Sequence, residues 1–396
     1  MLDQLTLTHE EAVERAKNLA TQIKPRFKIT EELRHQPQET IQDFIDSGLI
    51  RTVVPKRWGG YELGFNTLFR TGVEVAKADP SAGWVYTLLL VHTWMLAYFS
   101  EEAQRDVWEV NPDATIATTF NPFSKNEMFS AEGGYQLSGQ WGFSSGVDHC
   151  DWVLIQGNID LNQDGEAKEI VAMLVPKSDF KIQKTWKTIA QRGTGSNTIL
   201  LENVFIPKYR TIDLVAWCQR GEGSDKRTNT SFLYSHPLFA GMLSCLVSTI
   251  LGASIGAYEL WRDSIKNKVS LTSTKVADYT HQQIRVAEVS ASLAAAEALM
   301  EKIVERLDSG DPIDTYEKLR IRRNYAYITK LCNKAVRMIV DSSGAGSMYE
   351  SSPLQRYWRD VQGSSMHFTL NMDWVGEMFG KAELGISLNP KDTLIS

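Results

Sequence analysis

The sequence predicts a mainly α-helical protein with a β domain in its middle. Helix-start signals and long apolar runs fill residues 1–112, and short β-branched and aromatic segments separated by Gly, Asn and Asp turns fill residues 113–215. Long helical patterns return over residues 216–396. We therefore expect an N-terminal α-helical domain, a middle antiparallel β domain and a C-terminal four-helix bundle.

The bulk composition is that of an ordinary globular chain. Its 396 residues carry a net charge of -6, with 43% hydrophobic and 23% charged residues, which argues against nucleic acid as a partner. The N-terminus lacks the features of a signal peptide. The longest apolar run, LFAGMLSCLVSTILGASIGAY, is broken by Ser and Gly, so we expect a buried helix and no membrane partner. Four widely spaced cysteines favour reduced thiols and a cytoplasmic location, and the histidine spacing predicts no metal site.

Helix starts are clear in the first domain. Thr8 and Glu11 form a capping-box pattern, Asp79 precedes a proline, and Ser100 precedes an acidic first turn. The apolar helix after Asp79 carries His92 and Trp94. We expect these two side chains to line a substrate pocket, with plain core packing as the alternative.

The sequence predicts short β-strands in the middle domain. AEGGYQL predicts a β-hairpin, and the remaining strand candidates are TIATTF, DWVLIQGNI, IVAMLVP, FKIQKTW and NTILLENVFIP.

The sequence predicts long helices in the third domain. Small residues recur every fourth position in the first of them, so a neighbour can approach that face closely; they are Ser244, Ser248, Gly252 and Gly256. The next helix carries an apolar stripe at helical spacing, made of Ile284, Ala287, Ala291, Ala294 and Ala298. Two further helices are expected around residues 313–341 and 353–380.

Four segments carry a family resemblance when they are taken in order. VPKRWGGYELGF, GYQLSGQWGFSSG, QRGTGSNTILLENVFIP and SPLQRYWRD span nearly the whole chain. They resemble landmarks of the acyl-CoA dehydrogenase superfamily. The resemblance implies that superfamily's fold, a homotetramer that associates through the bundle, and a flavin wrapped by the middle domain.

The resemblance also assigns flavin contacts. It implies that the Ser145 hydroxyl faces flavin N5 and acts in catalysis, and that Phe143 covers the flavin ring. Hydroxyls offer hydrogen bonds without charge, and glycines let the backbone approach. A plain serine-rich turn is the alternative. The other implied cofactor-binding residues are Ser144, Gly146, Thr194, Gly195, Ser196, Gly344 and Gly346.

A histidine stands where acyl-CoA dehydrogenases often carry a catalytic glutamate. After the RD segment no glutamate occurs before Glu377, and His367 is expected to share a helix face with Asp360 and Gly363. A neutral imidazole suits an aromatic O–H or N–H better than the α-carbon of a thioester. A satisfied core histidine is the alternative. This departure resembles the two-component (group D) flavin monooxygenases, with His367 as a catalytic and substrate-binding residue.

That branch implies a specific reaction. Its oxygenase component takes FADH2 or FMNH2 from a separate NAD(P)H-dependent flavin reductase and reacts it with O2. The reaction passes through a C4a-hydroperoxyflavin and oxygenates a small aromatic substrate. WGFSSG and RYWRDVQGSSMH resemble the indole and indole-3-acetate oxygenases. The alternatives are a phenol-type hydroxylase like those for 4-hydroxyphenylacetate, a flavin dehydrogenase like the acyl-CoA dehydrogenases or nitroalkane oxidase, and a non-catalytic scaffold.

Overall fold

The computed structural model describes residues 6–121, 124–160, 168–224 and 228–388. The three predicted helix starts are confirmed: Thr8 and Glu11 form a capping box, the Asp79 carboxylate accepts backbone N–H bonds, and Ser100 caps its helix. The N-terminal helices are α1 (His9–Ile23), α2 (Phe27–Leu33), α3 (Gln38–Asp46), α4 (Phe65–Ala78), α5 (Pro80–Leu96) and α6 (Glu101–Trp108).

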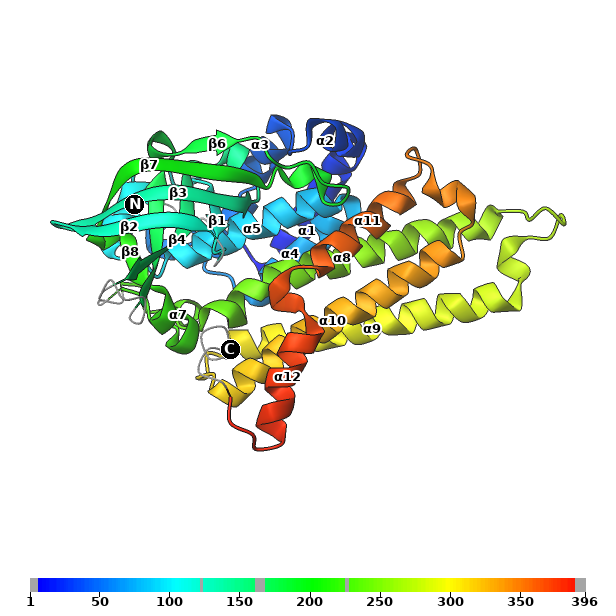
Figure 1. Cartoon of the computed structure of the whole chain (residues 1–396). Helices are drawn as coiled ribbons and strands as arrows, with labels where there is room; N and C mark the ends of the chain where they lie inside the picture. The colour runs from blue at the N-terminus through cyan, green and yellow to red at the C-terminus, as the bar shows by residue number, and fades with distance from the viewer. Residues whose placement is uncertain (1–5, 122–123, 161–167, 225–227, 389–396) are drawn as a thin grey trace.

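The middle segment forms two four-stranded sheets beside the N-terminal helices (Figure 1). The predicted hairpin is confirmed as β2 and β3, which pair antiparallel. The expectation of a wholly antiparallel domain is wrong in one pair, because β1 and β4 run parallel. After β1 the chain forms the β2–β3 hairpin in the other sheet. It then returns to the first sheet as β4, which runs in the same direction as β1. One sheet has the order β1 (Ile116–Thr119), β4 (Trp152–Asp160), β5 (Lys168–Pro176), β8 (Thr211–Asp213), and the other β2 (Lys125–Ala131), β3 (Gly134–Ser144), β7 (Asn197–Pro207), β6 (Lys181–Gln183).

The last segment is helical, as predicted. The small-residue face of α8 packs closely on α4: a Cβ added to Gly252 would lie 2.5 Å from the Val73 carbonyl oxygen. The helix α8 is apolar and long enough to cross a membrane, but most of its apolar window is buried in the protein, as expected of a core helix. The domain borders after residues 112 and 215 remain predictions. The helices are α7 (Leu214–Arg220), α8 (Leu238–Asn267), α9 (Thr280–Asp308), α10 (Thr315–Asp341), α11 (Pro353–Ser365) and α12 (Met372–Glu383).

The apolar stripe expected on α9 is not its buried face. Its alanines and Ile284 are exposed in the single chain. The larger side chains at other positions are buried instead, because each removes more apolar area from water than an alanine does. The buried residues include Val289, Leu293, Met300 and Ile303.

The single helix expected over residues 353–380 is broken. The helix α11 ends at Ser365, a short turn follows, and α12 begins after Asn371. The Asn371 side chain accepts the backbone N–H groups of Asp373 and Trp374, so it starts a new helix. This break determines where His367 lies.

Candidate functional site

Two loops far apart in the sequence meet at a buried cluster of hydroxyls. One loop follows β3 and the other precedes β7. The Gly146 N–H donates to the Thr194 carbonyl at 2.8 Å. The Ser145 Oγ lies 2.7 Å from the Ser196 Oγ, which lies 2.7 Å from the Thr194 Oγ1. The structure therefore brings together the two segments in which flavin contacts were predicted.

The backbone beside this hydroxyl cluster is unusually bare. Gly146 and Gly195 have φ of +73° and +56°, in the left-handed region that favours glycine. Phe143 also has a positive φ, of +65°; the residue is 67% exposed, and its ring centroid is 6.0 Å from that of Trp186. The neighbouring Ser144 hydroxyl is buried without a hydrogen-bond partner among the described residues. An exposed aromatic ring beside glycine backbone and an unpartnered hydroxyl fits a flat, hydrogen-bonding ring system such as a flavin.

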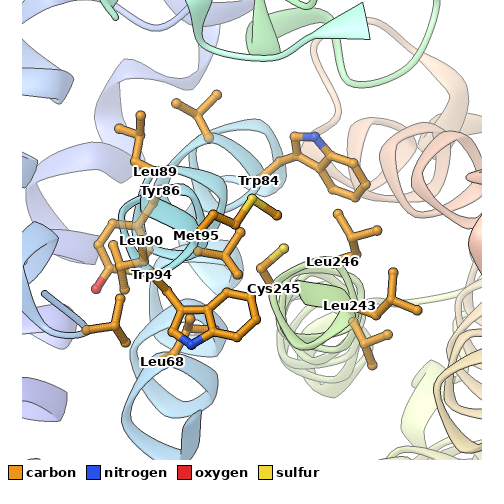
Figure 2. Close-up of a cluster of buried hydrophobic side chains, with 14 of the residues drawn as sticks. Leu68, Trp84, Tyr86, Leu89, Leu90, Trp94, Met95, Leu243, Cys245 and Leu246 are labelled. Atoms are coloured by element: carbon orange, nitrogen blue, oxygen red, sulfur yellow. The ribbon is translucent and has the colours of Figure 1, made fainter. Parts of the chain in front are cut away.

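Trp84, which the sequence analysis missed, connects the hydroxyl cluster to His367. Its indole N–H donates to the Ser145 Oγ at 3.2 Å, and its ring centroid lies 6.4 Å from that of His367. Figure 2 shows the indole extending from α5 toward the side of α8 that carries Leu246. The Asp79 cap sets the register of α5, and that register puts Trp84 and His92 two turns apart on one face.

His367 lies in the turn after α11, with a neutral imidazole. Its Nδ1 is 2.7 Å from the Thr369 Oγ1, and its ring stacks on Phe368 at 5.2 Å. The residue is partly exposed, yet burial by surrounding atoms lowers the His367 pKa to about 4. No hydrogen bond to Nε2 is found in the described ranges. A neutral imidazole with one free nitrogen can take a proton from an O–H or N–H group.

The expectation that His367 shares a helix face with Asp360 and Gly363 is wrong, because α11 ends before His367. Asp360 faces the loop before β7, where its Oδ1 accepts the Gln191 N–H at 2.6 Å. A Cβ on Gly363 would lie 2.5 Å from the Ala190 Cβ, so this glycine lets α11 approach the same loop.

The segment SPLQRYWRD carries two arginines, Arg356 and Arg359. In the single chain Arg356 is buried, and its Nη2 lies 2.5 Å from Asp79 Oδ1. Its Nε is 3.6 Å from Glu31 and 3.8 Å from Asp360. Arg356 therefore ties α11 to the start of α5.

The two residues predicted on α5 have different surroundings. Trp94 is fully buried, donates its N–H to the Leu233 carbonyl at 2.7 Å and packs on Phe65. These contacts agree with the core-packing alternative for Trp94. His92 donates from Nδ1 to the Ile116 carbonyl at 2.7 Å, and burial lowers its pKa to about 4. Leu88, one turn from both His92 and Trp84, is the partly exposed residue in an otherwise buried run of α5. This face of α5 therefore borders a space that solvent reaches.

Gly344 and Gly346 lie apart from the hydroxyl cluster in the single chain. They occupy the turn between α10 and α11, where Lys268 donates to the Ser343 carbonyl at 2.9 Å. They precede α11, whereas His367 follows it, and a helix of 13 residues spans about 20 Å. Neither glycine has a close neighbour that an added Cβ would meet.

The order of helices, sheets and bundle agrees with family comparisons. Residues 6–109 match the acyl-CoA dehydrogenase N-terminal domain, and residues 244–372 match the acyl-CoA dehydrogenase C-terminal domain. A crystal structure of 3-HSA hydroxylase from Rhodococcus sp. RHA1 has a TM-score of 0.90 and 29% identity, covering 98% of this chain and 100% of that one. The chain is thus a protein of the acyl-CoA dehydrogenase-like fold class.

Relatives define the family more narrowly. The oxygenase component of FADH(2)-dependent resorcinol hydroxylase from Rhizobium sp. (strain MTP-10005) is 33% identical to this chain. The match covers 98% of this chain and 96% of that protein. XiaF from Streptomyces sp., solved with FADH2 and glycerol, has a TM-score of 0.88 and 26% identity, covering 96% of each chain. Indole-3-acetate monooxygenase from Pseudomonas putida is 28% identical over 84% of each chain. The chain belongs to the family of flavin-dependent monooxygenase oxygenase components.

Family membership confirms several predictions. The acyl-CoA dehydrogenase-like fold, the monooxygenase class and the use of reduced flavin by the family agree with the relatives. The names of the relatives cover both phenolic and indolic substrates, so they do not decide between the two aromatic classes.

Proposed function

We propose that this chain is the oxygenase component of a two-component system that oxygenates a small aromatic substrate with reduced flavin and O2. A separate NAD(P)H-dependent flavin reductase supplies the reduced flavin. The observation that carries this proposal is the proximity of a neutral imidazole, His367, to the Trp84–Ser145 pair.

The hydroxyl cluster is proposed to hold the flavin ring. Ser145 is the candidate for the contact at N5, and its position is fixed from two sides by Trp84 and Ser196. Ser144 has an unused hydroxyl and is the neighbouring candidate. The rings of exposed Phe143 and partly exposed Trp186 form an apolar surface that a flavin ring would cover.

His367 is proposed as the substrate base. Its Nε2 accepts the proton of a ring O–H or N–H, which raises electron density at the ring carbon that is oxygenated. Bound reduced flavin supplies the two electrons that activate O2, so that one oxygen atom enters the ring and the other leaves as water. His92 and Leu88 are proposed to line the substrate side of α5.

Two substrate classes remain as proposals. Indole and indole-3-acetate are supported by the resemblance of WGFSSG and RYWRDVQGSSMH. A phenol is supported by the 33% identity to a resorcinol hydroxylase oxygenase component. A neutral imidazole accepts a proton from either ring, so His367 serves both.

Reconstitution with a purified flavin reductase tests the proposal. Indole, indole-3-acetate, resorcinol and 4-hydroxyphenylacetate are assayed side by side for oxygenated product, NADH use and hydrogen peroxide. The His367→Ala variant should still consume O2 but lose about a hundredfold in product formation. His281→Ala is the control, because His281 is exposed on α9. Normal product yield in His367→Ala would contradict the assignment, and substrate-dependent reduction of oxidised flavin without O2 would indicate a dehydrogenase.

We further propose a homotetramer in the cytoplasm. The exposed apolar stripe of α9 supports association through the bundle, since it includes Ile284 at 54% exposure flanked by exposed alanines. The four free, buried cysteines support a reducing compartment.

A further inference from the structure

Arg322 on α10 is a buried cation without a counterion among the described residues. Arg322 is 1% exposed, and none of its three guanidinium nitrogens has a hydrogen-bond partner in the part of the chain that the structure describes. Burial lowers the Arg322 pKa to about 10, so the group stays charged at neutral pH. A buried charge is costly unless it is paired, and arginine side chains are rarely buried without a partner. An anion bound beside Arg322 would therefore offset the cost of burying its charge.

Two aromatic rings flank the Arg322 guanidinium. Its central carbon lies 5.6 Å from the ring centroid of Phe239 and 5.1 Å from that of Trp374. Both rings are partly exposed. The guanidinium thus lies near two aromatic rings, and its N–H groups have no hydrogen-bond partner among the described residues.

The charged groups nearest Arg322 do not neutralise it. Lys318, one turn away, is a second buried cation and donates to the Gln219 carbonyl at 3.0 Å. Cys218 has a pKa raised to about 12 by burial, so it remains an uncharged thiol. Asp213 and Asp314 act on Cys218 and Lys318 respectively, and neither forms an ion pair with Arg322 within the described part of the chain. Two buried cations with no acid paired to Arg322 among the described residues make this part of the protein electropositive.

One face of α8 connects Arg322 with the candidate site. Phe239, Met242 and Leu246 share this face at spacings of three and four residues. Phe239 and Met242 are partly exposed in a stretch of α8 that is otherwise buried. Figure 2 shows Leu246 and Leu243 on the side of α8 toward which the Trp84 indole extends. Seven steps along α8, a rise of about 10 Å, separate Phe239, which lies beside Arg322, from Leu246, on the side toward which Trp84 extends.

We propose that Arg322 binds the carboxylate of an aromatic acid substrate whose ring lies beside Trp84 and His367. This inference rests on the proposed function and names its substrate class: a phenol or indole with a short acidic side chain. The guanidinium fork matches the two oxygens of a carboxylate, and Phe239 and Trp374 exclude water from the pair. Binding of the acid would satisfy the charge that the free protein leaves unpaired.

The experiment compares each acid with its neutral isostere. Binding of indole-3-acetate and indole-3-acetamide, and of 4-hydroxyphenylacetate and 4-hydroxyphenylacetamide, is measured by anaerobic calorimetry in the presence of reduced FAD. The wild type should bind at least one acid about tenfold or more tighter than its amide. Arg322→Met should lose that preference and bind the amide as the wild type does. Arg323→Met is the matched control, because this neighbour is partly exposed and lies over Phe379.

Two further measurements keep the outcomes distinct. Arg322→Met removes an unpaired charge, so its Tm should stay equal or rise, and Arg322→Lys should retain part of the acid preference. An unchanged acid preference in Arg322→Met, or none in the wild type while both amides are oxygenated, would overturn this inference and leave the proposed function standing. Loss of reduced-FAD binding in Arg322→Met would also overturn it, because the anion would then be the cofactor's phosphate. Binding of no aromatic ligand at all would overturn both proposals.

Discussion

The indole nitrogen of Trp84 lies 3.2 Å from the Ser145 hydroxyl, which ties α5 to the loop after β3. The same hydroxyl lies 2.7 Å from Ser196, on the loop before β7. One oxygen atom therefore connects the N-terminal helices with both segments proposed to hold the flavin. The Trp84 ring, whose centroid is 6.4 Å from that of His367, is placed there by packing between elements that are distant in the sequence.

Ser145→Ala should uncouple oxygen consumption from product formation. The substitution leaves the Trp84 N–H and the Ser196 hydroxyl without their partner, which costs about 1–3 kcal/mol of stability. Product formed per NADH should fall about tenfold, with hydrogen peroxide rising to match. The measurement is the ratio of product to peroxide in the reconstituted system, and Ser130→Ala is the control because Ser130 is exposed on β2. A larger effect of Ser144→Ala would move the proposed N5 contact to Ser144.

Asp360 should act on flavin affinity through Gln191. Gln191 has φ of +50°, its N–H is bound by Asp360 at 2.6 Å, and its carbonyl accepts from Trp186 and Thr194. Asp360→Ala removes the carboxylate that positions this loop, so the Kd for reduced flavin should rise about tenfold, from a loss of roughly 1.4 kcal/mol.

Asp360→Asn should restore much of that affinity, because its amide oxygen still accepts the Gln191 N–H. Anaerobic titration with reduced FAD measures the effect, with Glu350→Ala as an exposed control just before α11. Equal Kd values in Asp360→Ala and the wild type would show that the loop does not depend on this carboxylate.

His92 should make stability depend on pH between about 6.5 and 4. Its pKa is lowered by burial from 6.5 to about 4, so on acidification the unfolded chain takes up a proton before the folded chain does. Its stability contribution is present above pH 6.5 and is lost as the pH falls toward 4. Urea unfolding at several pH values should show a shallower decline for His92→Asn than for the wild type. Parallel curves for the two proteins would contradict the lowered pKa.

Ala291→Glu should disrupt the proposed assembly. Ala291 lies in the exposed apolar stripe of α9, and a charge there would be buried without a partner if two chains associate through that face. Sedimentation velocity should show a smaller species than the wild type, while Lys302→Glu, on the polar end of the same helix, should not. A wild-type sedimentation coefficient for Ala291→Glu would exclude this face from the subunit interface.

The sequence by itself determined the local features of this protein. The caps at Thr8, Asp79 and Ser100, the β2–β3 hairpin and the small face of α8 follow from rules that act over a few residues, and each was predicted correctly. The resemblance carried by the four ordered segments also identified the family correctly.

The tertiary structure decided which side chains meet. Periodicity alone extended one helix through His367, whereas the Asn371 cap and packing against α10 break that helix and turn the imidazole toward Trp84. The parallel pairing of β1 with β4 joins segments more than twelve residues apart. Which face of α9 is exposed likewise depends on the distant helices that pack against its other face. The same holds for Arg322, because whether a buried charge has a counterion depends on every element packed around it, and no local pattern records that.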